Sequence, residues 1–236
     1  MNAVAGGGGF IAFPALVFVG VPQVPANATN TVALWTGLTA SGGAYRKQFD
    51  VPVKVLVPLL IAGVMGGVLG AFLLLRTPEH TFARLLPWLM LGATLLFIFG
   101  RMLAGKRTSS VGWQATNAAI VGASLFEFFV AIYGGYFGGG LGIVNLAMLA
   151  AVGMTDIHAM NALKSVLSSA INGVAVIVFI FSKVIFWPHA AVMTLGALLG
   201  GYFGAKYSLR LPQIWIRWFV ILVGTSMTIY FFTRAY

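Results

Sequence analysis

The amino-acid sequence predicts an all-α, polytopic transmembrane helical bundle that is built from two inverted repeats. Hydrophobic residues make up 60% of the 236 residues, whereas charged residues make up only 8%. Soluble domains carry about 25% charged residues, so this composition excludes that class of protein. Apolar segments of spanning length recur along the chain, and a run of glycines interrupts each half of it. These patterns predict spanning helices together with glycine-broken half-helices.

A series of apolar segments predicts eight or nine membrane segments. In chain order they are residues 9–21, 27–45, 55–75, 85–100, 111–136, 141–153, 156–182, 184–205 and 214–233. A helix needs about 20 apolar residues to cross the hydrocarbon core of a bilayer. The segments 9–21 and 141–153 are too short for that, so each is expected to be a half-helix.

Each of these two short segments begins at a run of glycines, one at residues 6–9 and the other at residues 134–142. The backbone groups that a broken helix frees must find partners inside protein, because lipid offers none. Breaks at matching positions of two halves therefore point to the substrate site of a transporter.

Glycine runs of this kind also suit a particular ligand. Their exposed amides, next to the N-terminus of the following helix, attract an anion. The alternative is that the glycines only permit a tight turn and close packing. The site residues expected from the two runs are Gly7, Gly8, Gly9, Gly138, Gly139 and Gly140.

The two halves of the chain align with each other when one is shifted by 133 residues, which places Gly9 on Gly142. A single ungapped offset aligns both the glycines of the two runs and the glycines within the spans, as expected of an internal repeat. The repeats predicted from this alignment are residues 1–107 and 108–236. Small residues let helices approach closely in a membrane, and the glycines expected to serve such packing are Gly63, Gly66, Gly67, Gly70, Gly196 and Gly200.

The distribution of basic residues predicts the topology. If 111–136 and 141–153 both traverse the membrane to some depth, nine basic residues fall on one side and four on the other. If they form one broken span, the division is eight to five. Basic residues concentrate in cytoplasmic loops, so the first arrangement is favoured. It makes the repeats inverted and places the 46–54 and 101–107 loops in the cytoplasm.

Lys164 is the first candidate for binding a substrate. Asn161, Lys164, Ser168 and Asn172 are spaced by three, four and four residues, which places them on one face of a helix. A lysine at mid-membrane costs about 2.5–3.5 kcal/mol on insertion scales, so it is expected to face a cavity or a partner. This polar stripe predicts an anion site. The alternative is that Lys164 lies near the interface and extends its ammonium to water.

Glu127 is the carboxylate that lies well inside a predicted span. It has two possible functional roles, carrying a coupling proton or neutralising Lys164 when no substrate is bound. The alternative is a neutral, hydrogen-bonded glutamic acid that holds two helices together.

Further polar residues are expected to complete the site. Thr29 and Asn30 belong to a polar segment that occupies the repeat position equivalent to residues 160–164, and they predict a second wall without positive charge. Asn145 follows the second glycine run. It is expected either to donate to a bound oxyanion or to cap a broken helix.

The sequence also predicts several absences. HExxH, GxSxG and Walker motifs do not occur, so no enzyme activity is expected. The three histidines are scattered and there is no cysteine, so neither a metal nor a cofactor is expected. The net charge of +10 fits topology and lipid headgroups rather than nucleic acid. The expected partners are a small anionic solute, the bilayer, and a coupling proton or cation, and a homodimer is left open.

Two groups of residues resemble a known family. The first glycine run followed by Pro14, Ala26-x-x-Thr29 and Tyr45-Arg46 resembles the first repeat of the sulfite exporter TauE/SafE family. The second run followed by Asn161-Ala162-Leu163-Lys164 resembles its second repeat. The resemblance covers nearly the whole chain. It implies a multi-pass permease of the bacterial inner (plasma) membrane that moves small anions, notably sulfite and organosulfonates.

The sequence departs from the family pattern before the first glycine run. Members carry an apolar half-helix there that matches 111–136, whereas only residues 1–5 precede the run in this sequence. Either the start lies upstream or one wall of the first repeat is missing. The function predicted from all of this is a secondary transporter that works by alternating access. The alternatives are a passive anion channel and a non-transporting scaffold or assembly protein.

Overall fold

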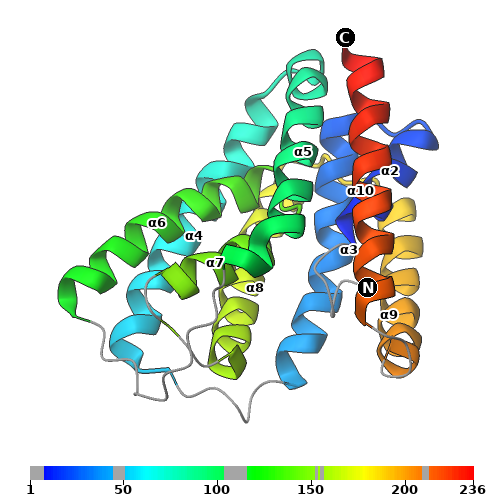
Figure 1. The fold of residues 1–236 in the computed structure, drawn as a ribbon. Helices are drawn as coiled ribbons and strands as arrows, with labels where there is room; N and C mark the ends of the chain where they lie inside the picture. The colour runs from blue at the N-terminus through cyan, green and yellow to red at the C-terminus, as the bar shows by residue number, and fades with distance from the viewer. Residues whose placement is uncertain (1–7, 45–50, 104–115, 152–153, 155–156, 209–212) are drawn as a thin grey trace.

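The computed structural model describes residues 8–44, 51–103, 116–151, 154, 157–208 and 213–236. Within these residues the chain forms nine helices and no strand, which confirms the predicted all-α bundle. In order, the helices are α2 (Gly9–Phe18), α3 (Gln23–Ala44), α4 (Val53–Arg76), α5 (Glu79–Leu103), α6 (Asn117–Tyr136), α7 (Leu141–Ala151), α8 (Ile157–Phe181), α9 (Trp187–Ser208) and α10 (Gln213–Ala235) (Figure 1).

Several of these helices are long and apolar enough to cross a membrane. Within the described ranges, five meet both criteria: Val53–Arg76, Glu79–Phe99, Asn117–Tyr136, Ala159–Phe181 and Trp218–Ala235. By contrast, α2 and α7 have 10 and 11 residues. At 1.5 Å per residue they extend about 15 Å, half of the about 30 Å hydrocarbon core. They therefore have the length of half-helices.

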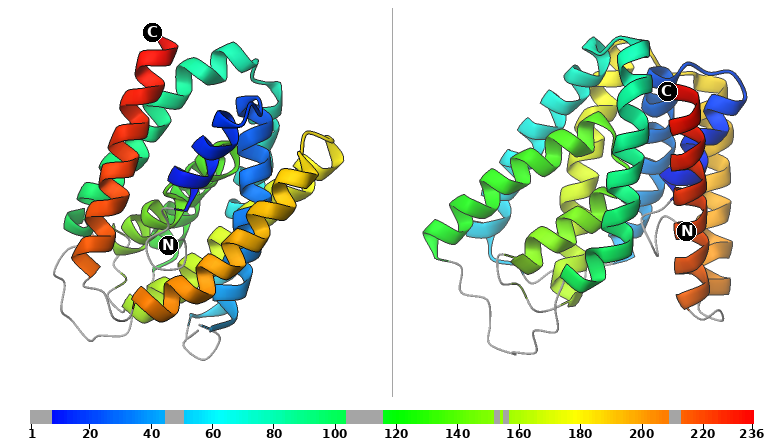
Figure 2. Two further views of the ribbon diagram at one scale, coloured as in Figure 1. Left: turned by 90° about the vertical axis from the view of Figure 1, so that its right-hand side faces the viewer. Right: turned by 45° about the horizontal axis from the view of Figure 1, so that its top comes forward.

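The helices of the first half run opposite to their counterparts in the second half (Figure 1). Helices α2 and α4 run upward in that view, where α7 and α9 run downward. Helices α3 and α5 run downward, where α8 and α10 run upward, and the two further views in Figure 2 agree. This is the arrangement expected of inverted repeats, and it favours separate traversals by α6 and α7. The repeat itself stays a prediction.

The two halves are packed together through several helix pairs. Helix α3 contacts α8 and α9, α4 contacts α6 and α8, and α5 contacts α10. In the α3–α8 contact, the Trp35 indole donates a hydrogen bond to the backbone oxygen of Ser169 at 2.9 Å. Gly173 on α8 leaves room for this ring, because a Cβ there would lie 3.1 Å from the indole nitrogen.

The closest helix contact is between α4 and α6, and glycines make it possible. A Cβ on Gly66 would lie 2.3 Å from the backbone oxygen of Phe128, and a Cβ on Gly70 would lie 2.1 Å from that of Ile132. Real Cβ atoms do not approach a carbonyl so closely, so only glycine fits at both positions. The expected packing role is confirmed here.

The other packing glycines differ from one another. Gly63 and Gly67 face Ile171 of α8, where an added Cβ would lie 3.4 and 3.1 Å from its nearest atoms. Gly196 has nothing within 4 Å of an added Cβ among the described residues, so the packing role predicted for it is wrong there. The surroundings of Gly200 lie outside the described residues.

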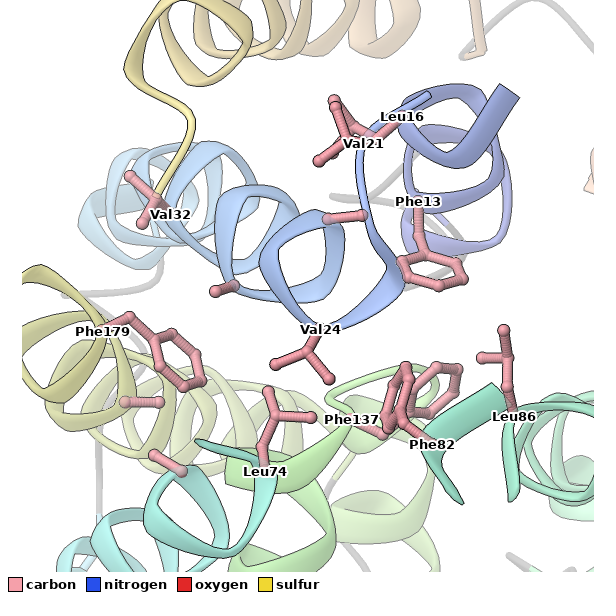
Figure 3. Packing of buried hydrophobic residues seen from close by; sticks show 14 of the residues in the cluster. Phe13, Leu16, Val21, Val24, Val32, Leu74, Phe82, Leu86, Phe137 and Phe179 are labelled. Carbon is pink, nitrogen blue, oxygen red and sulfur yellow. The ribbon is translucent and has the colours of Figure 1, made fainter. Parts of the chain in front are cut away.

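The largest hydrophobic cluster lies where the two halves meet. Figure 3 shows Phe13 of α2 and Val24 of α3 opposite Leu74, Phe82 and Phe137, which come from α4, α5 and the α6–α7 connection. All five side chains are at most 7% exposed. Burial of these side chains fixes the connection between α6 and α7 against α2.

Two helices, α3 and α5, begin at least four residues earlier than the hydropathy pattern predicts. Helix α3 begins at Gln23 rather than at residue 27, because a proline in the first turn, here Pro25, does not disturb a helix. The Glu79 carboxylate accepts hydrogen bonds from the backbone N–H groups of Gln23 and Val24 at 3.0 and 3.1 Å. Glu79 itself begins α5, where the sequence predicts a loop up to residue 84.

Substitution of Gly70 tests the α4–α6 contact. Gly70→Ala is expected to lower the melting temperature of the purified protein, because overpacking of a tight contact costs about 1–3 kcal/mol. Gly92→Ala is the control, since an added Cβ there has nothing within 4 Å in the described part of the chain. Alanine at that helical position gains up to about 1 kcal/mol of helix propensity. Equal melting temperatures for the two variants would contradict the packing role.

Candidate functional site

One cavity brings the two glycine runs together. Its lining residues are Gly9, Phe13, Asn27, Asn30, Thr31, Leu34, Leu38, Phe137, Gly138, Gly139 and Asn172. They come from α2, α3, the α6–α7 connection and α8. The cavity volume is about 40 Å³, roughly three times the 10–15 Å³ that one water molecule needs. The cavity therefore suits a small solute.

The α6–α7 connection is a tight turn built on two glycines. Gly138 and Gly140 have φ angles of 75° and 74°, in the left-handed region that favours glycine. The carbonyl of Tyr136, the last residue of α6, accepts a hydrogen bond from Asn27 Nδ2 of α3 at 2.9 Å. The Tyr133 hydroxyl donates to the backbone oxygen of Gly139. Partners from both halves thus satisfy two carbonyls at the turn.

The turn also contacts the first half-helix directly. The Phe13 and Phe137 rings pack edge to face with their centroids 6.3 Å apart (Figure 3). Both rings line the cavity. The contact therefore joins α2 to the α6–α7 turn at the cavity wall.

Two helix N-termini lie at the cavity. Helix α2 begins at Gly9, and α7 begins at Leu141, shortly after Gly138 and Gly139. The first N–H groups of a helix have no partner within it, and the N-terminus carries partial positive charge. The described lining contains no lysine, arginine or histidine. Among these described lining groups, partial positive charge is therefore expected from the helix N-termini rather than from a basic side chain.

Some polar residues of α3 line the cavity, and one contacts the start of α9. Asn30 lines the cavity, together with Asn27 and Thr31. Thr29 lies outside the cavity lining. Its buried hydroxyl oxygen instead accepts a hydrogen bond from the backbone N–H of Phe186 at 3.1 Å. Thr29 thus connects α3 to the residue before α9.

The other members of the predicted α8 stripe lie outside the cavity lining. The stem of Lys164 lies along Gly142, with Cδ 3.5 Å from the position of an added Cβ. Its ammonium donates to Asn161 Oδ1 at 3.1 Å. Asn145 Nδ2 of α7 donates to Ser168 Oγ at 3.2 Å, and both side chains are buried. These four residues connect α7 with α8 beside the cavity.

Glu127 lies at the junction of α4, α6 and α8. Its side chain is fully buried, and neither carboxyl oxygen has a hydrogen-bond partner among the described residues. Oε1 lies 3.6 Å from the position of an added Cβ on Gly63. A buried carboxyl without a partner costs free energy. A proton or a cation is the kind of partner that would complete it.

Three further glycines predicted to belong to the site are not among the described residues of the cavity lining. Gly7 lies outside the described residues. Gly8 precedes α2, and its carbonyl accepts hydrogen bonds from Ile11 and Ala12 in the first turn. Gly140 is buried against Ala93 of α5 and does not line the cavity.

Comparison with known proteins identifies the family. A family profile described as Sulfite exporter TauE/SafE matches residues 1–231. The chain belongs to this family. A probable membrane transporter protein of Haemophilus influenzae is 28% identical over 97% of this chain and 88% of its own length. The probable membrane transporter proteins ORF9 of Sinorhizobium sp. and YfcA of Escherichia coli K12 are 27% and 24% identical, also over 97% of this chain and over 86% and 83% of their own lengths.

Membership of the TauE/SafE family confirms the resemblance seen in the sequence. Together with the five apolar helices, it makes this chain a membrane transporter with a small solute as its substrate. The family is one of transporters rather than enzymes. No solved structure matches the chain.

Four apolar residues of this TauE/SafE chain's cavity were not predicted from the sequence: Phe13, Leu34, Leu38 and Phe137. Phe137 carried a signal, because it stands inside the second glycine run. The other three are ordinary apolar residues of helices. Only their contacts across the two halves reveal them.

The hydrogen bond from Asn27 to Tyr136 is expected to stabilise the turn. Asn27→Leu leaves the end of α6 without this donor, and an unpaired buried group costs about 1–3 kcal/mol. The melting temperature should fall accordingly. Asn117→Leu is the control, because Asn117 is exposed at the start of α6. Equal melting temperatures in the two variants would show that the turn holds without Asn27.

Proposed function

We propose that this chain is a secondary transporter that moves a small anion of the sulfite or organosulfonate class across the bacterial inner (plasma) membrane. The observation that carries the proposal is the meeting of two glycine runs, one from each half, at a single cavity. Half-helix N-termini that face a site between two repeats recognise anionic groups in transporters. Backbone N–H groups near Gly9 and Gly139 would bind the oxyanion.

The proposal also assigns a role to the positive charge of Lys164, which lies outside the cavity lining. It lies eight residues before the cavity residue Asn172 on α8, which is about 12 Å at 1.5 Å per residue. Its contact with Asn161 holds the ammonium in place. The anion would pass Lys164, Asn145 and Ser168 between the cavity and the end of the bundle at which α7 ends and α8 begins.

The proposed mechanism is alternating access by movement of one half against the other. The antiparallel course of α2–α5 and α7–α10 (Figure 1) supports it, because inverted repeats permit two related conformations around one site. Glu127 would carry the coupling proton. Its buried carboxyl oxygens without partners support that role.

Transport by two variants in proteoliposomes tests the site. Lys164→Ala is expected to reduce sulfite uptake at least tenfold, because a charge on the pathway is lost. Gly9→Ala adds one methyl group at the cavity wall, where its neighbours would lie at ordinary contact distances of 3.6 Å. It should fold normally and reduce uptake several-fold.

The matched controls are Lys54→Ala and Gly37→Ala. Lys54 is exposed in the first turn of α4, and an added Cβ on Gly37 has nothing within 4 Å among the described residues. Both controls should retain wild-type uptake. Undiminished sulfite and sulfonate uptake by both Lys164→Ala and Gly9→Ala would overturn the proposed site. Uptake that does not saturate with substrate would indicate a channel instead.

The Glu127→Gln variant tests proton coupling. Glutamine keeps the size of the side chain and removes the proton that the carboxyl exchanges. An imposed pH gradient is expected to change the initial uptake rate of the wild type several-fold and that of Glu127→Gln little. If the gradient changes both rates equally, Glu127 does not couple protons. A loss of folding in the variant, seen by gel filtration, would favour a purely structural role.

A further inference from the structure

Two apolar clusters lie along the helices that surround Glu127. The first lies near the α6–α7 turn and is formed by Val130, Ala131, Leu141 and Ile171. The second lies toward the end of the bundle at which α8 begins, and it includes Val55, Leu59, Ala123, Met148, Leu149, Leu163 and Leu167. Helices α6, α7 and α8 contribute to both clusters, so each of them has a short segment between the two.

A buried polar residue occupies that segment on each of the three helices. On α6, Glu127 lies midway between Ala131 of the first cluster and Ala123 of the second, four residues from each. On α7, Asn145 is likewise four residues from a member of each cluster. On α8, Ser168 lies one residue after a member of the second cluster and three before a member of the first. Residues four apart share a helix face, so the three polar side chains lie at one level.

Contacts across the helices join this level. Glu127 Oε1 lies 3.6 Å from the position of an added Cβ on Gly63, and Ile171 Cγ1 lies 3.4 Å from the same position, so the carboxyl lies beside α8. Asn145 Nδ2 donates to Ser168 Oγ at 3.2 Å. Glu127 and Asn145 are 0% exposed and Ser168 is 4% exposed. These three side chains form a polar layer between the two apolar clusters.

The polar layer holds more acceptors than donors. Both carboxyl oxygens of Glu127 and Oδ1 of Asn145 are enclosed, and none of them has a hydrogen-bond partner among the described residues. The amide nitrogen of Asn145 is directed to Ser168. Buried polar atoms of folded proteins are nearly always paired. One further donor between the carboxyl and the amide oxygen would therefore complete the layer.

The charged and titratable side chains described on the neighbouring helices do not supply that donor. Lys54 and Arg76 are exposed in the first and last turns of α4, and Lys164 is hydrogen-bonded within α8. On α6 itself, Tyr133 and Tyr136 bond through their hydroxyls to the α6–α7 turn and to the start of the α4–α5 connection. A metal ion needs a shell of several oxygens around it, whereas a proton needs only two oxygens and little space. The enclosed layer therefore suits a proton.

We infer that Glu127 holds the coupling proton in a hydrogen bond to Asn145. The protonated carboxyl donates its O–H to Asn145 Oδ1, and Asn145 Nδ2 donates onward to Ser168, so one proton connects α6, α7 and α8. The proton comes from water on one side of the membrane and returns to water on the other when the halves exchange conformations. Asn145 is thus a positioning residue for the proton. This inference rests on the proposed function and adds a residue to its coupling site.

The hydrogen bond also connects the proton to the proposed anion pathway. Asn145 lies three residues after Gly142, along which the stem of Lys164 lies. Ser168 lies four residues after Lys164 on the same face of α8. Protonation of Glu127 therefore strengthens the α7–α8 contact one turn from the lysine.

Infrared difference spectra of the purified full-length protein between two pH values test the hydrogen bond. A protonated carboxyl gives a C=O stretching band, and Glu127→Gln should remove the band of Glu127. Asn145→Leu should move that band to higher frequency, because the carboxyl then lacks its acceptor. Asn145→Ala is measured in parallel, should shift the band in the same direction, and keeps the test decisive if leucine prevents folding. Asn117→Leu, at an exposed position, should leave the band unchanged.

Uptake in proteoliposomes gives a second readout. The ratio of sulfite uptake with and without an imposed pH gradient should fall several-fold in Asn145→Leu. Asn145→Asp should retain the response, because it keeps an acceptor oxygen of the same shape and two carboxyls at one site share a proton. A purely structural role of Asn145 would change the uptake rate and leave this ratio unchanged.

The outcomes separate this inference from the proposed function. Ser124 Oγ, three residues before Glu127, also lacks a partner among the described residues. A band that shifts in Ser124→Ala and not in Asn145→Leu would assign the acceptor to Ser124, overturn the inference and leave Glu127 as the coupling residue. Absence of any Glu127 band, with uptake driven by a sodium gradient instead of a pH gradient, would overturn the inference and the proton role of Glu127 while anion transport stands. Absence of anion uptake by the wild type would overturn the proposed function itself.

Discussion

The constraint on which the structure depends is that a broken helix inside a bilayer must have partners for its freed backbone groups. Helix α6 ends in the protein interior, and its last carbonyl, that of Tyr136, accepts from Asn27 in the other half. The Tyr133 hydroxyl donates a hydrogen bond to the backbone oxygen of Gly139 within the second half. Because one partner comes from each half, these bonds join the halves at the turn. The cavity lies at the same place, with residues of both halves in its lining.

Helix packing also holds the α6–α7 turn in place. Glycines on α4 let α6 approach so closely that Gly66 and Gly70 almost touch its backbone, and this places the end of α6 within the bundle. The contact between Phe13 and Phe137 then fixes α2 to the turn. Helix packing thus sets the position of the turn, and the glycine conformations at residues 138 and 140 set its shape.

Much of the fold could be predicted from the sequence, and less of the site. Hydropathy identifies every helix of the described residues, because membrane segments and half-helices alike are apolar over most of their length. Break glycines from both runs line the cavity, as their repetition suggested. The sequence could not separate Asn30, which lines the cavity, from its neighbour Thr29, which bonds to Phe186. Adjacent residues on a helix face different neighbours, and only the helix packing determines which of them faces the cavity.

The two halves differ in chemistry at the positions that a shift of 133 residues aligns. Gly9 packs beside Asn30, and Gly142, its equivalent in the predicted repeat, packs beside Lys164. A shift of 133 residues also places Thr31, a cavity residue, on Lys164. If the halves exchange conformations, as inverted repeats do, the face of Gly142 and Lys164 takes the place that Gly9 and Thr31 occupy here. The polar side chains beside the two glycines would then differ between the states, an asparagine in one and a lysine in the other.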